Sequence, residues 1–299
     1  MAEVIEKPIS YSHLDALSRE YGIKPDILVK TFKLERAFHQ EILATDSADE
    51  RVRQYNELYS EVYRLKREGA QGEPQEGTAS QYSRLVHTFR RELAGKSVLD
   101  VGCGTGLFLS LISRLLPHGD LCGIDTADVT SPEDAQSIQF VTTSVIDFRL
   151  NRTFDVVYSH QVLEHIAPAD LPCHLRSIHS ALRPGGKFIV ILPNRYWGPQ
   201  DITRIVDNTF TGRIPAMGSH LNESSYTELM PQLEAFGFRK IRTVLPLAAF
   251  VPPLRHFRVR PWLNKRLERH SGLRNLSNLV RVHGRPIFKN PIILICERM

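Results

Sequence analysis

The stretch VLDVGCGTG, residues 98–106, decides the fold of this 299-residue chain. A short apolar run leads directly into Gly102, Gly104 and Gly106, and the apolar segment LFLSLISRLL that follows has helical spacing. Glycine at such a junction lets the backbone turn tightly and lets a ligand approach the main chain. The sequence therefore predicts a strand, a ligand-binding loop and a helix in succession.

The chain beyond this loop alternates between strand and helix patterns. Such alternation implies βαβ units, a mostly parallel sheet and helices on both of its faces. The segment RPGG, residues 183–186, reads as a turn between a helix and a strand. Six further apolar runs read as strands: LCGID, IQFVTT, FDVVYS, KFIVILPN, FRKIRTVLPL and PIILICER.

Residues 1–75 carry no strand pattern, and we predict a helical region there, ahead of a ligand-binding domain at 76–299. Apolar residues recur at helical spacing on both sides of Ser47, which is placed to cap the second helix. A stretch rich in Gly, Glu and Gln, residues 69–80, reads as a linker. A stripe of tyrosines at every fourth position is typical of core packing, or one of them lines a pocket: Tyr55, Tyr59 and Tyr63.

Carboxylates stand at two points of the predicted sheet. Asp125 ends the second strand, where a carboxylate can accept hydrogen bonds from both hydroxyls of a ribose. Asp100 lies inside the first motif, and we expect it to orient the loop or to meet a ligand ammonium group. The glycine spacing is G-x-G-x-G rather than G-x-G-x-x-G, so we expect the loop to pass an amino acid and a ribose, not a pyrophosphate.

A third motif, FDVVYSHQVLEHI at residues 154–166, ends a predicted strand at Ser159 and leads into a predicted helix. Ligands of open α/β sheets bind beyond the carboxyl ends of the strands. We therefore expect four residues to lie near a reaction centre: His160, Gln161, Glu164 and His165.

These motifs, with LRPGG, closely resemble the class I family of methyltransferases that use S-adenosylmethionine (SAM), over about residues 80–193. The resemblance implies a Rossmann-like α/β fold whose seven strands lie in the order 3-2-1-4-5-7-6, with the last strand antiparallel. The N-terminal helices would cap the SAM pocket. The layout is similar to bacterial enzymes that tailor glycans, lipids or natural products.

The resemblance also implies roles for individual residues. The three glycines match the loop beside the methionine part of SAM, and Asp125 matches the acid that binds ribose. A segment that cradles adenine corresponds to Ser144, Val145 and Ile146, where Ser144 replaces the usual Asp and Asp147 is the alternative contact. The expected cofactor-binding set is Asp100, Gly102, Gly104, Gly106, Asp125, Ser144, Val145, Ile146 and Ser159.

Methyl transfer to oxygen requires removal of a proton from the acceptor. Histidine suits that task near neutral pH. His160, His165 and His220 are all candidates for the base, and the sequence does not choose among them. Asp201 is a candidate to orient such a histidine.

The segment after the predicted fourth strand also bears on whether the protein binds a metal ion. Ubiquinone-pathway O-methyltransferases carry a Glu-x-x-Glu-His pattern that is implicated in metal binding. The corresponding residues here are Gln161, Glu164 and His165, so an amide replaces one hard carboxylate and weakens a divalent cation site. We therefore predict no required metal.

Charge is concentrated late in the chain. Residues 255–289, a predicted insertion before the last strand, hold ten Lys or Arg against Glu268 alone, whereas the whole chain has a formal charge of only +5. Interleaved apolar residues fit an anionic membrane surface or a lipid-linked acceptor. The other interpretations are a solvated helical face, and RNA phosphates, which we regard as the weakest because no RNA-binding module is recognised.

Four cysteines without CxxC spacing indicate reduced thiols, and no leader or membrane-spanning run is seen, so we expect a cytoplasmic protein, peripheral to a membrane at most. The expected function is SAM-dependent O-methylation of a hydroxyl on a sugar, lipid-linked or natural-product acceptor. An RNA methyltransferase and a non-catalytic SAM-binding subunit remain as alternatives, and the sequence leaves the oligomeric state open.

Overall fold

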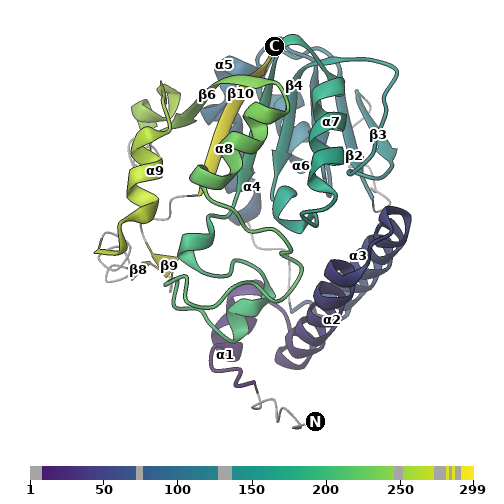
Figure 1. Cartoon of the computed structure of the whole chain (residues 1–299), viewed down its shortest axis with the longest axis vertical. Helices are drawn as coiled ribbons and strands as arrows, with labels where there is room; N and C mark the ends of the chain where they lie inside the picture. Colours follow the sequence, from purple (N-terminus) through teal and green to yellow (C-terminus); the bar gives the residue numbers. More distant parts are fainter. Residues whose placement is uncertain are drawn as a thin grey trace.

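The computed structural model describes residues 9–71, 77–126, 137–245, 252–272, 281–282, 285–286 and 291–299. The predicted boundary between residues 75 and 76 lies outside the described residues, as do Arg274, Lys289 and their neighbours in the basic insertion. Figure 1 shows a sheet with helices on both sides, and the first helices gathered beside the end of the sheet opposite to the C-terminus.

The main sheet confirms the predicted Rossmann-like fold. Its order is β3-β2-β1-β4-β5-β10-β6-β7, in which β10 runs antiparallel to both β5 and β6. The first seven positions follow the expected order, and the insertion adds a two-residue eighth strand, β7, at the edge. The strands are β1 (Val98–Val101), β2 (Leu121–Asp125), β3 (Ile138–Thr142), β4 (Phe154–His160), β5 (Leu182–Leu192), β6 (Phe238–Val244), β7 (Arg258–Val259) and β10 (Ile292–Arg298); β8 (Arg281–Val282) and β9 (Arg285–Pro286) pair separately.

Helices cover the two faces of the sheet, and the central strands are apolar on both sides for that reason. In β5, Phe188 and Val190 pack into one core with α7 and α8, whereas Ile189 and Ile191 pack into the other with α4 and α6. The helices are α1 (Leu14–Tyr21), α2 (Pro25–Ala44), α3 (Ala48–Gly69), α4 (Gly77–Thr88), α5 (Arg90–Leu93), α6 (Leu107–Leu115), α7 (Leu171–Ala181), α8 (Tyr226–Ala235) and α9 (Trp262–Arg269). Within the described segments, no helix is both long and apolar enough to cross a membrane.

Two local predictions differ from the structure. The segment RPGG is not a turn that precedes β5 but part of it, and the register with β4 shifts there, so the extra residues are absorbed as an irregularity of the strand. The helix expected after Ser159 is only a 3₁₀ turn, Leu163–His165, because β4 continues to His160 and Gln161 then takes a positive φ of 58°.

The helices α2 and α3 form an antiparallel hairpin beside the sheet (Figure 1). Ser47 caps α3 as predicted, since its Oγ accepts a hydrogen bond from the Glu50 amide at 3.3 Å. A buried ion pair fixes α3 to the start of α7, where Arg51 Nε donates to Asp170 Oδ2 at 2.8 Å. Tyr55 Oη accepts a hydrogen bond from the Ala167 amide at 2.7 Å, so two polar contacts hold α3 against the sheet domain.

We expect the substitution Asp170→Asn to lower the free energy of unfolding by about 3–5 kcal/mol, because it leaves the buried Arg51 guanidinium without its counter-charge. Urea unfolding followed by circular dichroism measures the change. The control is Glu61→Gln, which removes a partner of Arg64 on the exposed side of α3 and should change little. Equal effects of the two substitutions would contradict the anchoring role of Asp170.

Candidate active site

A cavity opens at the carboxyl ends of β1, β2 and β4, where the fold predicts a ligand site. One side of it consists of sheet loops, and the other consists of α2 and α3. The side chains and main chain that line it are Glu35, Val52, Tyr55, Asn56, Tyr59, Val62, Tyr63, Lys66, Gly102, Gly104, Asp125, Thr126, Ser144, Val145, Ile146, Gln161, Val162, His165, Ile166 and Ser219.

The glycine loop forms the floor of this cavity and requires glycine for steric reasons. Gly102 has a φ of 74°, and a Cβ there would lie 2.4 Å from Val162 Cγ2. Gly104 has a φ of 53°, but a Cβ would meet no atom within 4 Å, so its outer side is open space. The Gly104 amide donates to Asp125 Oδ2 at 2.8 Å, which fixes the loop against the end of β2. A ligand can therefore approach the main chain at Gly104.

The predicted adenine segment also lines the cavity, and α7 holds it in place. His174 is fully buried and its Nδ1 donates to the Val145 carbonyl at 2.7 Å, while burial lowers the pKa of His174 to about 4 and keeps it neutral. Ser177 Oγ donates to the Ile146 carbonyl at 3.2 Å. We did not predict a role for these two residues. The only indication in the sequence was that two polar residues stand three positions apart on a predicted helix. Asp147 is exposed and borders a separate surface depression.

A smaller second cavity lies behind the glycine loop. It contains Asp100, Tyr82 and His160, whose ring meets that of Tyr82 at a centroid distance of 5.5 Å. Burial, and then the charge of Asp125, raise the pKa of Asp100 well above its usual value. Ser159 is fully buried and lines neither cavity. The loop thus separates His160 from the other two candidate histidines.

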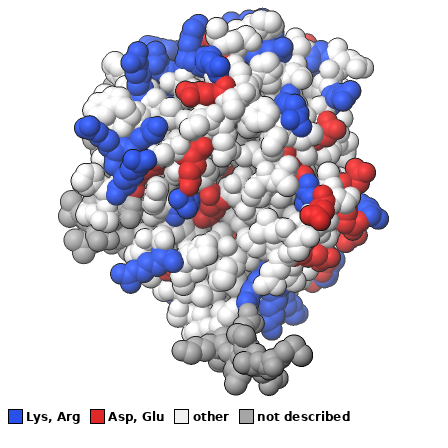
Figure 2. All heavy atoms as spheres, viewed as in Figure 1, with Lys and Arg blue, Asp and Glu red and all other residues white. Residues whose placement is uncertain are grey.

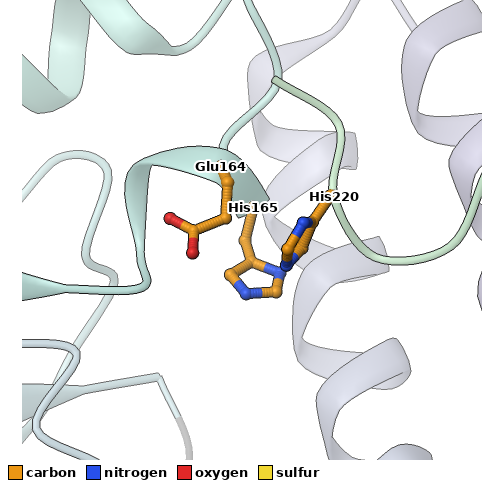
Figure 3. A group of neighbouring side chains, drawn as sticks. All are labelled: Glu164, His165 and His220. Carbon is orange, nitrogen blue, oxygen red and sulfur yellow. The ribbon is translucent and has the colours of Figure 1, made fainter. Parts of the chain in front are cut away.

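Those two histidines lie together with Glu164 (Figure 3). The rings of His165 and His220 are 4.7 Å apart, and each of the three residues offers one potential ligand atom, all within 4.8 Å of one another. His165 Nδ1 faces the Ser219 carbonyl at 3.1 Å and His220 Nδ1 faces Glu223 Oε1 at 2.7 Å. A carbonyl can only accept, so His165 carries its proton on Nδ1 when neutral and keeps the Nε2 lone pair available.

Buried charges give the three residues different protonation states. Burial alone would lower the pKa of His220, but the bond to Glu223 and the charges of Asp201 and Glu164 raise it to about 9. Burial and the His220 charge hold the pKa of His165 well below its usual value. Burial raises the pKa of Glu164 to about 7, and both its carboxylate oxygens lack hydrogen-bond partners in the described structure.

This arrangement bears on the metal question. The three side chains have suitable donor atoms for a divalent cation, but a protonated imidazole has no lone pair to give. A protonated His220 therefore places a positive charge in this cluster and cannot coordinate a metal ion. The absence of a required metal stays a prediction.

Asp201 lies close to His220 but contacts its main chain. Asp201 Oδ2 accepts from the Gly218 amide at 2.9 Å and from the His220 amide at 3.4 Å, and Oδ1 accepts from the Thr203 amide. The carboxylate that orients the His220 ring is Glu223, which sequence reasoning missed. The only indication in the sequence was that Glu223 follows His220 by three residues in a predicted loop. Such spacing does not predict a contact unless the fold is known.

The helical side of the cavity contributes aromatic and charged groups. All three stripe tyrosines line it, and Tyr59 meets the His165 ring edge-on at a centroid distance of 6.0 Å. Glu35 on α2 accepts from the Ser219 amide at 2.8 Å, and burial, followed by the charge of Asp201, raises its pKa. Lys66 on α3 adds one exposed cation. Neither Glu35 nor Lys66 was predicted, because only folding brings α2 and α3 to the sheet edge.

The sequence is similar to known methyltransferases. Residues 75–243 match the family described as a methyltransferase domain. Demethylspheroidene O-methyltransferase of Rhodobacter capsulatus is 30% identical over 188 residues, which cover 58% of this chain and 47% of the relative. A ubiquinone biosynthesis O-methyltransferase of Nitrobacter winogradskyi is 31% identical over 112 residues, covering 35% of this chain and 41% of the relative. The chain thus matches less than half the length of these two relatives.

Among solved structures, the 1,6-didemethyltoxoflavin-N1-methyltransferase of Burkholderia thailandensis aligns with a TM-score of 0.44 and 16% identity, over 75% of this chain and 80% of that one. The family match alone covers more than half of the chain. The chain belongs to the methyltransferase domain family, and its resemblance to the class I SAM-dependent methyltransferases is confirmed.

SAM is the cofactor of this family, and the large cavity fits it. The open space at Gly104, the Asp125 carboxylate and the segment from Ser144 to Ile146 border one continuous hollow, as an extended nucleoside with an amino-acid tail requires. The individual contacts remain expectations.

We expect Asp125→Ala to weaken SAM binding about a hundredfold, because it removes the acceptor of two ribose hydrogen bonds worth about 1.5 kcal/mol each and frees the Gly104 amide. Isothermal titration calorimetry measures the affinity. Asp120→Ala, at an exposed position just before β2, is the matched control. Unchanged affinity in the Asp125 variant would rule out this residue as the ribose acid.

Proposed function

We propose that the protein is an O-methyltransferase that transfers a methyl group from SAM to a hydroxyl of a small natural-product or lipid-linked acceptor. The observation that carries the proposal is the position of His165, a neutral histidine in the same cavity as the glycine loop and Asp125. A base beside the cofactor cavity is what transfer to oxygen needs. The two O-methyltransferase relatives support oxygen as the methylated atom.

Each residue of the cluster has a separate role in the proposed reaction. SAM, when bound, would supply an electrophilic methyl group: the acceptor oxygen bonds to the methyl carbon, the bond from that carbon to sulfur breaks, and S-adenosylhomocysteine is the leaving group. His165 Nε2 takes the acceptor proton, and the Nδ1 contact to Ser219 fixes the ring for that role. Glu164, beside His165, offsets the positive charge that His165 gains. The charged His220 and its partner Glu223 hold the loop that carries Ser219.

The walls of the cavity favour an acceptor with a flat or apolar body. Aliphatic side chains from both the sheet loops and α3 face it, among them Val52, Val62, Val162 and Ile166. Tyr59 and Tyr63 add aromatic surface, on which a ring packs well. Such a lining suits a phenol or a lipid-linked ring better than a bare sugar, whose hydroxyls would need more polar partners. No observation favours RNA at this cavity.

The decisive test incubates the protein with methyl-labelled SAM and a cell extract, and then partitions the label between organic and aqueous phases. We expect organic-soluble label from the wild type and at least a hundredfold less from His165→Ala, because general-base catalysis contributes about 10²–10⁴. SAM affinity should stay unchanged. His118→Ala, in the loop before β2, is the control.

Three results would contradict the proposal. Label that appears only in nuclease-sensitive material would indicate an RNA methyltransferase. SAM binding with no transfer to any fraction would indicate a non-catalytic subunit. Loss of transfer in His160→Ala but not in His165→Ala would move the base to the second cavity.

We expect the transfer rate to rise with pH through about 7, where the free Glu164 carboxyl loses its proton. Below that pH the neutral carboxyl cannot offset the charge on His165, so the rate falls. The Glu164→Gln variant should transfer the methyl group more slowly, and its rate should no longer rise with pH near 7. The measurement is the rate of label transfer across the neutral range, with Glu234→Gln on α8 as control. An unchanged rise with pH in the Glu164 variant would assign the titration to another group.

A further inference from the structure

The outer side of the insertion presents a surface that the proposed chemistry does not use. We call it the basic face; it comprises Phe257, Arg260, Trp262, Lys265, Arg266 and Arg269. Lys and Arg side chains gather over α9 at the left of Figure 2. Phe257 and Trp262 are 57% and 58% exposed, and they are among the most exposed large apolar side chains of the described structure.

The orientation of α9 is the reverse of an ordinary surface helix, which turns its apolar side inward. Its buried positions are polar: Asn264 donates to Tyr226 Oη at 3.1 Å, and Glu268 accepts from the Tyr226 and Thr227 amides at 2.9 and 3.1 Å. Its exposed positions, four and then three residues apart, are Trp262, Arg266 and Arg269. Folding therefore turns the one acidic residue of 255–289 inward and leaves cations outside.

The outward cations lack local counter-charges. In the described chain, Arg260, Lys265, Arg266 and Arg269 form no ion pair, whereas the neighbouring Arg258 is paired with Glu92 and anchors the insertion to α5. The Arg266 guanidinium lies over the Trp262 ring, 5.6 Å from its centroid. This keeps cation and aromatic surface side by side.

We propose that the basic face docks on an anionic lipid bilayer. The cations would lie against lipid phosphates, and Trp262 and Phe257 would enter the headgroup region, where amphipathic aromatic side chains are favoured. Single-stranded RNA would use the same cations, but it binds in grooves where bases stack. Neither aromatic residue lines the cavity beside α3, the smaller cavity behind the glycine loop or the surface depression at Asp147. The proposal does not depend on the methyl acceptor.

Vesicle co-sedimentation of the full chain tests the charges. We expect binding to mixed phosphatidylcholine and phosphatidylglycerol vesicles, little binding to phosphatidylcholine alone, and weakening with salt. Arg266→Glu/Arg269→Glu should bind at least about twenty-five-fold more weakly, because each basic side chain lost weakens binding about fivefold. The control Lys33→Glu/Arg176→Glu makes the same change in net charge on α2 and α7 and should bind as the wild type does.

Tryptophan fluorescence tests the contact itself. The chain has two tryptophans, of which Trp197 is buried and Trp262 is exposed. A change in the fluorescence of Trp262 can therefore be distinguished from the emission of Trp197. Anionic vesicles should shift the emission to the blue, and the shift should vanish in Trp262→Phe, which should still sediment with the vesicles. Both measurements leave methyl transfer aside, so they can fail or succeed independently of the proposed activity.

Four outcomes would overturn the proposal. These are equal binding to neutral vesicles, equal losses in the α9 and control variants, a blue shift that survives in Trp262→Phe, and salt-sensitive binding of single-stranded RNA without vesicle binding. Circular dichroism of each variant shows whether it is folded, and Arg260→Gln provides a milder substitution if the double variant is not.

Discussion

The steric demand of the glycine loop is the constraint on which the rest of the site depends. The Gly102 and Cys103 amides both bond to the Ile124 carbonyl, and the Gly104 amide bonds to Asp125. The turn after β1 is thus fixed to the end of β2, and no side chain fits at Gly102. A cavity lies on each side of this loop, and the larger one takes its second wall from α3.

That second wall is held by buried polar contacts rather than by hydrophobic packing alone. The Arg51–Asp170 pair and the Tyr55–Ala167 bond lie between α3 and the start of α7. The same helix α7 carries His174 and Ser177, which fix the predicted adenine segment. One helix therefore positions both a cofactor loop and the helices opposite to it, which links the geometry of the two walls.

The strands and the glycine loop could be predicted because they depend on local patterns of apolar residues and glycines. The order of the strands was implied by the family resemblance and is confirmed, whereas the cofactor contacts of the glycines and Asp125 stay predictions. The partners of the candidate base could not be predicted in this way. Ser219 and Glu223 contact His165 and His220 only after the loop before α8 folds over the sheet edge, and Glu35 on α2 then accepts from the Ser219 amide. The prediction of a turn at RPGG was wrong because proline and glycine at an irregularity within a strand form the same sequence pattern as a turn between two elements.

The inward carboxylate of Glu268 has a consequence for anyone who would redesign this chain. It accepts hydrogen bonds from the first two amides of α8 and from the Asn194 side chain beyond the end of β5. A helix on the outer surface therefore satisfies amides that Ser225, the N-cap residue of α8, leaves without an acceptor. The insertion is not a detachable module. A shortened version must bring its own acceptor to α8, and a graft of this segment onto another protein would carry a buried charge that its new host must satisfy.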